Sequence, residues 1–155
     1  MLSLMFGIGA GKIEIRIPKI AYVVGEAIEG DLILSMNSPQ KARGVFLRLY
    51  AEQKYREYTH GSGSHHSHGH WETTSRRVHE FVLQFDGERE YPKTSQPLVY
   101  PFRIYVPQQA HILRQNASGG FTGGAGPVGY PEWFLEAYLD LPLAFDVQTR
   151  VQLSI

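Results

Sequence analysis

The chain contains no cysteine and carries no net charge, and these two absences exclude several classes of protein. Without thiols there is no disulfide bond and no thiolate metal site. Lys and Arg together number 15, as do Asp and Glu, which gives a net charge of +0. Binding to nucleic acid usually requires a basic patch that releases counterions from the phosphates. We therefore expect no nucleic-acid partner, and the lack of cysteine is compatible with the cytoplasmic location that we expect.

A long hydrophobic run is also missing. Residues 1–11 are apolar but too few to cross a bilayer, which takes about 20 residues. They lack the basic start and the small-residue cleavage site of a secretory signal. We expect no transmembrane segment, and we interpret 1–11 as a first strand or an apolar arm on the core. Weak membrane contact is the alternative.

Enzyme signatures are absent as well. The glycine-rich residues 7–12 look superficially like a phosphate loop, but they precede a strand, and Ile13 stands where such a loop needs Ser or Thr. There is no Gly-x-Ser-x-Gly nucleophile elbow. We therefore expect no enzyme, no catalytic residue and no cofactor. A hydrolytic or sugar-binding sandwich would rest on analogy of fold alone.

Alternating apolar and polar residues are abundant. The chain has 155 residues, a length that suits a single domain over 1–155, and its nine Tyr and eight Phe favour strands. Several alternating runs at short spacing, separated by Gly and Pro, predict an all-β fold, an antiparallel immunoglobulin-like sandwich. No stretch shows a convincing helical period. The predicted core consists of Ile13, Ile15, Leu32, Leu34, Leu47, Leu49, Phe102, Ile104, Leu135, Val151 and Leu153.

A long β-hairpin is predicted in the middle of the chain. Its first strand covers 41–58 and becomes polar in its far half, and its second strand returns from Trp71 with Phe81, Leu83 and Phe85 facing inward. A loop rich in His, Gly and Ser, at about 60–70, joins the two strands. We interpret 108–130 as a flexible segment without periodicity that contains a Gly-rich loop at about 116–130. Strict alternation predicts a further strand over 132–139.

Three short motifs resemble the N-terminal domain of the arrestins. They are Tyr22 with Gly25-Glu26 and Gly30, Tyr100-Pro101-Phe102 running to Val106-Pro107, and Glu136 to Asp140 with Pro142 and Asp146. Together with residues 7–12, they look most like the bacterial and archaeal arrestin-like sporulation-control proteins. The resemblance implies an arrestin-type sandwich and a non-enzymatic scaffold or adaptor. It extends over one of the family's two sandwich domains, so the family's receptor-phosphate switch, which needs both, is not implied.

Five histidines gather in the predicted hairpin loop and form a candidate metal site: His60, His65, His66, His68 and His70. Neutral imidazole binds zinc, nickel or copper, and His-x-His spacing lets two rings reach one ion. Ordering a Gly/Ser-rich loop costs roughly 1 kcal/mol per residue, which metal binding would have to offset. We interpret the loop as solvated, and weak zinc or nickel binding is the alternative function.

Five aromatic residues alternate away from the predicted core faces: Phe46, Tyr50, Tyr105, Phe134 and Tyr138. Exposed aromatics on neighbouring strands would form an apolar patch of the kind that marks an interface. We expect this patch, or an open strand edge, to bind unidentified partner proteins or a second copy of the chain. The alternative is intramolecular cover by 1–11 and 108–130. The leading hypothesis is thus a cytoplasmic, arrestin-like protein-interaction module.

Overall fold

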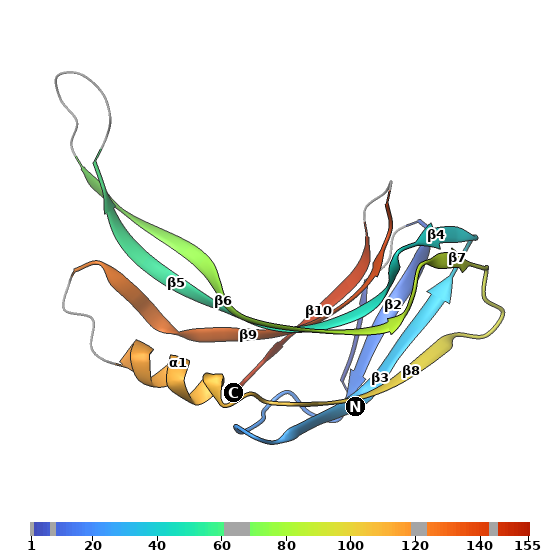
Figure 1. Cartoon of the computed structure of the whole chain (residues 1–155), viewed down its shortest axis with the longest axis horizontal. Helices are drawn as coiled ribbons and strands as arrows, with labels where there is room; N and C mark the ends of the chain where they lie inside the picture. The colour runs from blue at the N-terminus through green and yellow to red at the C-terminus, as the bar shows by residue number, and fades with distance from the viewer. Residues whose placement is uncertain (1, 7–8, 61–68, 119–123, 143–145) are drawn as a thin grey trace.

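The computed structural model describes residues 2–6, 9–60, 69–118, 124–142 and 146–155. These residues form ten β-strands and one α-helix, α1 (Gln109–Ser118), as Figure 1 shows. The strands are β1 (Leu2–Phe6), β2 (Gly11–Ile17), β3 (Ala27–Met36), β4 (Gln40–Ala42), β5 (Gly44–Thr59), β6 (His70–Asp86), β7 (Arg89–Tyr91), β8 (Leu98–Tyr105), β9 (Gly126–Asp140) and β10 (Val147–Leu153).

Two four-stranded sheets make up the body of the molecule. Their strand orders are β1-β2-β3-β8 and β10-β9-β5-β6, and β4 pairs with β7 in a small third sheet. Every pair of neighbouring strands is antiparallel. The predicted all-β antiparallel sandwich is therefore confirmed.

One hydrophobic cluster fills the space between the two sheets. Every residue of the predicted core is buried, and Ile13, Leu32 and Leu135 have no exposed surface at all. Alternation produces this result because successive side chains of a strand point to opposite faces of its sheet. On β10, for example, Val147, Val151 and Leu153 are buried in turn.

The glycines of the first arrestin-like motif have specific structural roles. Gly25 has φ 83°, a left-handed conformation that favours glycine, and its N–H donates to the carbonyl of Val106 at 3.0 Å. Gly30 lies where a Cβ atom would come within 2.2 Å of the carbonyl oxygen of Arg16. The turn thus holds the end of β8, and Gly30 lets β3 approach β2 closely.

The predicted hairpin is present, and its far half projects beyond the body as an arm (Figure 1). Gln53 fixes the base of this arm although it is a buried polar residue. Its Nε2 lies within 3.1 Å of the carbonyl oxygens of Lys54, Val128 and Gly129, so that it can donate to them where β9 departs from regular pairing with β5. The inward prediction for Phe81 is only partly right, because its side chain is 47% exposed.

The prediction of a flexible segment at 108–130 is wrong over 109–118, which form α1. Ala110, Leu113 and Ala117 follow a helical spacing, and Ala110 joins the core cluster with Leu113 packed against it. Pro107 precedes the helix, where its missing N–H does no harm. Strand β9 also begins at Gly126, within the predicted Gly-rich loop, of which 119–123 lie outside the described residues.

Asp86, the last residue of β6, connects three elements. Its carboxylate accepts hydrogen bonds from Arg89 at 2.9 Å, from the hydroxyl of Tyr100 at 2.9 Å and from the N–H of Gly87 at 2.9 Å. The Arg89 hydrogen bond, above all, lowers the pKa of Asp86, and burial raises the pKa of Tyr100. The cluster therefore ties β6 to β7 and β8 when Asp86 is ionised.

The low pKa of Asp86 predicts a pH-dependent contribution to stability. Because its folded-state pKa lies below the ordinary value of about 3.9, the stabilisation is present above that pH and is lost as pH falls through the folded-state value. We expect Asp86→Asn to lower the free energy of unfolding at pH 7 and to match the wild type more closely near pH 3. Urea denaturation at both pH values measures this, and a constant difference would contradict it.

Candidate functional site

The outer face of the β10-β9-β5-β6 sheet is concave and is the candidate site. Figure 1 shows this sheet curving upward toward the arm, away from the other sheet and from α1. We define the concave face by ten side chains that the strand registers bring together: Phe46, Arg48, Tyr50 and Glu52 of β5, Arg77 and Glu80 of β6, Phe134, Glu136 and Tyr138 of β9, and Arg150 of β10.

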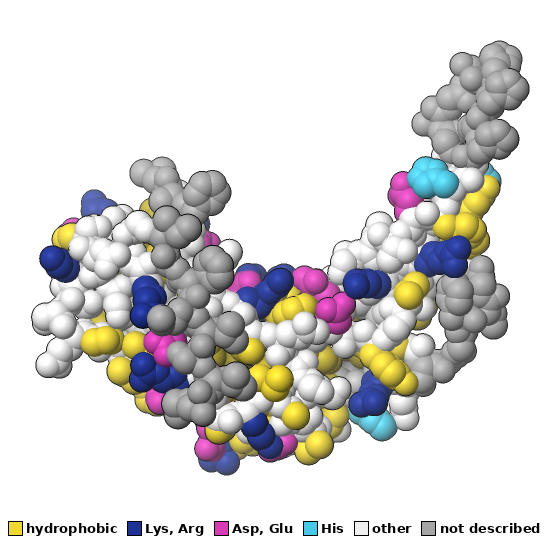
Figure 2. Space-filling view, turned by 180° about the vertical axis from the view of Figure 1, so that it is seen from behind, with side chains coloured by type: hydrophobic (Ala, Val, Ile, Leu, Met, Phe, Trp, Pro, Cys, Tyr) yellow, Lys and Arg dark blue, Asp and Glu magenta, His cyan; other side chains and the backbone are white. Residues whose placement is uncertain are grey.

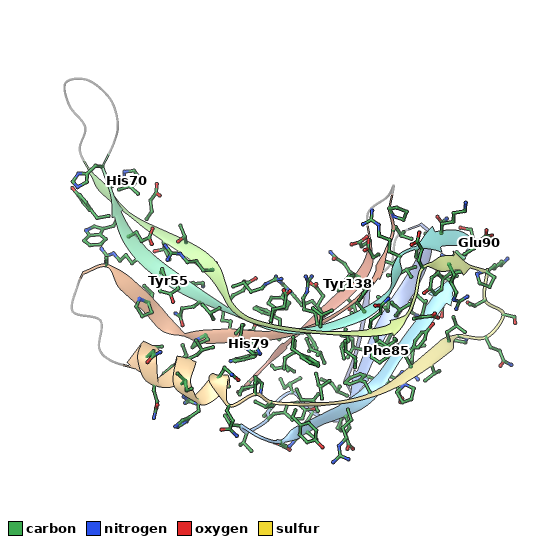
Figure 3. The ribbon with its side chains drawn as sticks, viewed as in Figure 1. Tyr55, His70, His79, Phe85, Glu90 and Tyr138 are labelled. Atoms are coloured by element: carbon green, nitrogen blue, oxygen red, sulfur yellow. The ribbon has the colours of Figure 1, made fainter. Side chains whose placement is uncertain are left out.

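Two aromatic pairs stack across β5 and β9. Phe46 lies opposite Tyr138 with ring centroids 5.1 Å apart and an interplanar angle of 16°. Tyr50 lies opposite Phe134 with centroids 5.3 Å apart and an angle of 28°. Neither Tyr50 nor Phe134 belongs to the inter-sheet core cluster. The structure thus brings together four of the five predicted interaction-surface aromatics, and Figure 3 shows Tyr138 on this side of the sheet.

The expectation that these aromatics are exposed is wrong for Tyr50, which is 1% exposed, and for Phe134, which is 8% exposed. Guanidinium groups cover them. Arg77 lies 4.0 Å from the Tyr50 ring, and Arg150 lies 4.5 Å from the Phe134 ring while donating to the Tyr50 hydroxyl at 3.2 Å. A flat guanidinium stacks favourably on an aromatic face. Phe46 and Tyr138 are half-buried, and burial raises the pKa of Tyr138.

Arg48 lies between the two aromatic pairs and is the most constrained charge of the face. Its guanidinium is 5.0 Å from the Tyr138 ring and pairs with Glu136, and a weaker pair at 3.7 Å joins it to Glu80. Its Nε is buried and has no hydrogen-bond partner among the described residues. A buried donor without a partner costs free energy, which the ion pairs and the ring contact of the same guanidinium must offset.

Charges on the concave face balance. Three arginines, Arg48, Arg77 and Arg150, meet three glutamates, Glu52, Glu80 and Glu136. Arg77 bonds to Glu80 at 2.5 Å and lies 3.9 Å from Glu52. Figure 2 shows basic and acidic side chains side by side on the floor of the hollow. The face is therefore a zwitterionic layer of planar groups over aromatic rings, which suits binding to a protein surface better than to a polyanion.

The same chemistry continues onto the arm. Tyr58 and Trp71 face each other across β5 and β6 with ring centroids 5.3 Å apart, and Arg56 lies 4.6 Å from the Trp71 ring. Both aromatic side chains are exposed. None of these three residues was predicted as part of an interaction surface. Lys54, Arg56 and Tyr58 nevertheless continue, at every second position of β5, the series that begins with Phe46 on the concave face.

Tyr105, the fifth predicted aromatic, lies elsewhere. It ends β8 and is 57% exposed, with Arg103 5.5 Å from its ring. It borders an opening between β8 and β6 instead of the concave face. The predicted interaction surface therefore divides into two places.

The predicted histidine cluster is described only at its two ends, because His65, His66 and His68 lie outside the described residues. His60 follows β5 with its ring 5.0 Å from that of Tyr58, and His70 begins β6 with Nε2 2.7 Å from Glu72 Oε1. Within the described part of the chain, no three His, Asp or Glu side chains are grouped so as to hold a metal ion. Nor do the described residues include a helix that is long and apolar enough to span a bilayer.

Comparison with known proteins supports the fold. No protein-family model matches the chain, and no curated protein matches it. Among solved structures, it is similar to the crystal structure of Spo0M, a sporulation control protein from Bacillus subtilis, with a TM-score of 0.54 and 20% identity. The match covers 95% of this chain and 49% of that one, so the chain spans about half the length of Spo0M. The fold is arrestin-like, as the sequence motifs predicted.

The different burial of the aromatics predicts different effects of truncation. We expect Phe134→Ala to lower the free energy of unfolding by roughly 3 kcal/mol, because it removes a covered ring and exposes its stacking partner. Tyr105→Ala, the control at an exposed aromatic, should change it by less than about 0.5 kcal/mol. Chemical denaturation of the two variants tests this. Equally small effects would show that the guanidinium cover contributes nothing.

Proposed function

We propose that this domain is a non-enzymatic protein-interaction module and that its main contact surface is the concave face with the adjoining arm. The observation that carries the proposal is the layer of arginines stacked on Tyr50, Phe134 and Tyr138. Arg, Tyr and Trp are the residue types that contribute most of the binding energy at protein interfaces. In this layer they are already held in place by stacking, so a partner would pay little entropy to order them.

The chemistry of the face defines the kind of partner. Because its charges balance, long-range attraction of a strongly charged molecule does not drive binding. Instead, a protein surface that carries both signs of charge can exchange the ion pairs of Arg77 with Glu52 and Glu80 for its own. The partner contact is thus specified by geometry, with the arm enclosing one side of the hollow.

A regulatory role is consistent with the fold comparison. Spo0M is described as a sporulation control protein, and we infer a scaffold or adaptor function of that general kind, in the cytoplasm, for this chain. At 20% identity, however, the likeness concerns the fold. We therefore infer the kind of partner from the residues of the concave face and not from the comparison.

Affinity capture from the native host, quantified by mass spectrometry, tests the proposal. The double variant carries Tyr138→Ser and Arg150→Glu, which remove a half-buried ring and reverse one charge. We expect it to retain the proteins that the wild type captures specifically in amounts at least about tenfold lower. Lys12→Glu, on the outer side of the other sheet and away from β8, is the control charge reversal and should capture them normally. Equal capture by all three proteins, with each folded, would reject the concave face as the contact surface.

Metal binding is the second candidate function, and one observation favours it. His60 and His70 stand at the facing ends of β5 and β6, and Glu72 supplies a carboxylate to His70 in the manner of a residue that orients a metal-binding ring. If the hairpin tip binds zinc, calorimetric titration should give a saturable signal that His60→Ala with His70→Ala abolishes. His111→Ala, an exposed histidine of α1, is the control. A wild-type protein without a saturable signal would end this alternative.

A further inference from the structure

The two sheets have edge strands on two sides of the sandwich, and the contacts between the sheets differ between these sides. On one side β10 contacts β1 and β2 of the opposite sheet. On the other side the last strands are β6 and β8, and no strand of the described residues pairs with the outer edge of either one. Both edges therefore present backbone N–H and C=O groups that no described strand satisfies.

Strands β6 and β8 touch at one end and separate toward the other. Phe85 of β6 packs against Tyr100 and Phe102 of β8, with ring centroids 5.7 and 6.5 Å away. Farther along, a groove of about 360 Å³ opens between the strands and is lined mainly by Leu49, Phe81, Leu83, Ile104, Tyr105 and Pro107. Figure 3 shows His79 and Phe85 on the β8-facing side of β6, and His79 also lines the groove.

Phe81 shows that the core is incomplete at this groove. It lies opposite Leu49 in the register and on the same face of the sheet, yet it is 47% exposed whereas Leu49 is 1% exposed. A large apolar side chain that points between two sheets is normally covered by the opposite layer. Here that layer stops at β8, one strand short of covering Phe81.

We propose that this groove is a second docking site, which takes an extended segment of a partner protein as a strand added to the free edge of β8. A strand in that position would bond to the unpaired backbone of β8 and would direct every second side chain toward Phe81. The groove thus fits a segment with apolar residues at alternate positions. A strand added to β6 would extend the opposite sheet away from the groove and leave Phe81 uncovered.

A second copy of the chain fits this groove poorly. If the β8 edges of two copies paired, the inward residues Phe102 and Ile104 of each would still point into their own core, where both are buried. The groove would stay empty. An extended segment with no core of its own has free side chains to fill it. Burial lowers the pKa of His79, which lines the groove.

A pair of synthetic peptides tests the proposal on the full chain. The probe is Lys-Val-Thr-Val-Thr-Val-Thr-Val-Lys, and its control, Lys-Val-Val-Thr-Thr-Val-Val-Thr-Lys, has the same composition without the alternation. Fluorescence anisotropy up to about 1 mM peptide should show at least about tenfold tighter binding of the alternating probe. Hydrogen exchange should show that this probe protects amides of β8, which an apolar pocket alone would not do.

Two neighbouring residues of β6 provide matched variants. Phe81→Asp changes the groove and should weaken probe binding about tenfold or more, whereas Val82→Asp changes a side chain of similar exposure, 42%, on the opposite face of β6 and should not. Tyr105→Asp, on the groove wall, is a second variant should Phe81→Asp not fold. Tyr138→Ser should bind the probe normally, which separates this site from the concave face.

Three results would overturn the proposal. The first is no preference for the alternating probe, including no binding of either peptide. The second is protection of β6 or of the concave face in place of β8. The third is a dimer in light scattering that Phe81→Asp dissociates, because a second copy would then occupy the groove.

Discussion

The alternation of side chains along β5 is the constraint on which the rest of this structure depends. Strand β5 is paired on both edges, with β6 and with β9, so its register fixes both neighbours. Leu47 and Leu49 point into the core, whereas Arg48 and Tyr50 point to the concave face. A slip of one residue would exchange the two faces, burying a guanidinium and exposing leucines, so stability of the core and geometry of the candidate site are specified together.

The concave face is ordered by contacts between flat groups. A sheet with one face outside the core would ordinarily present long polar side chains to water. Here Tyr50 and Phe134 are buried without belonging to the core, because the guanidinium groups of Arg77 and Arg150 lie on their rings. The arrangement holds the arginines in place by contacts with rings and, for Arg48 and Arg77, by ion pairs. It leaves the Arg48 Nε as the one described buried side-chain polar atom without a hydrogen-bond partner.

The edge strands β8 and β6 explain why one side of the sandwich is open. Strand β8 is held at its end by the turn at Gly25, and near its start by the hydrogen bond from Tyr100 to Asp86. Between these anchors no described strand pairs with the outer edge of β8, so Phe81 of β6 has no strand opposite it and is left partly uncovered. The groove thus results from the missing neighbour of β8, whereas the arm results from the greater length of β5 and β6 relative to β8.

The sequence by itself determined the long strands, most of their inward residues and the fold, because burial on one face imposes a period of two that Ile13, Leu32 and Val151 display directly. It did not predict the short strands β4 and β7. It also pointed to four aromatics of the concave face. Helix α1 could have been found from Ala110, Leu113 and Ala117, but the glycines that follow it favoured a loop. Only the tertiary structure decided that guanidiniums from three strands cover the rings and that Phe81 is left half-exposed. Both facts depend on which strands lie side by side and where each one ends, and local alternation contains neither.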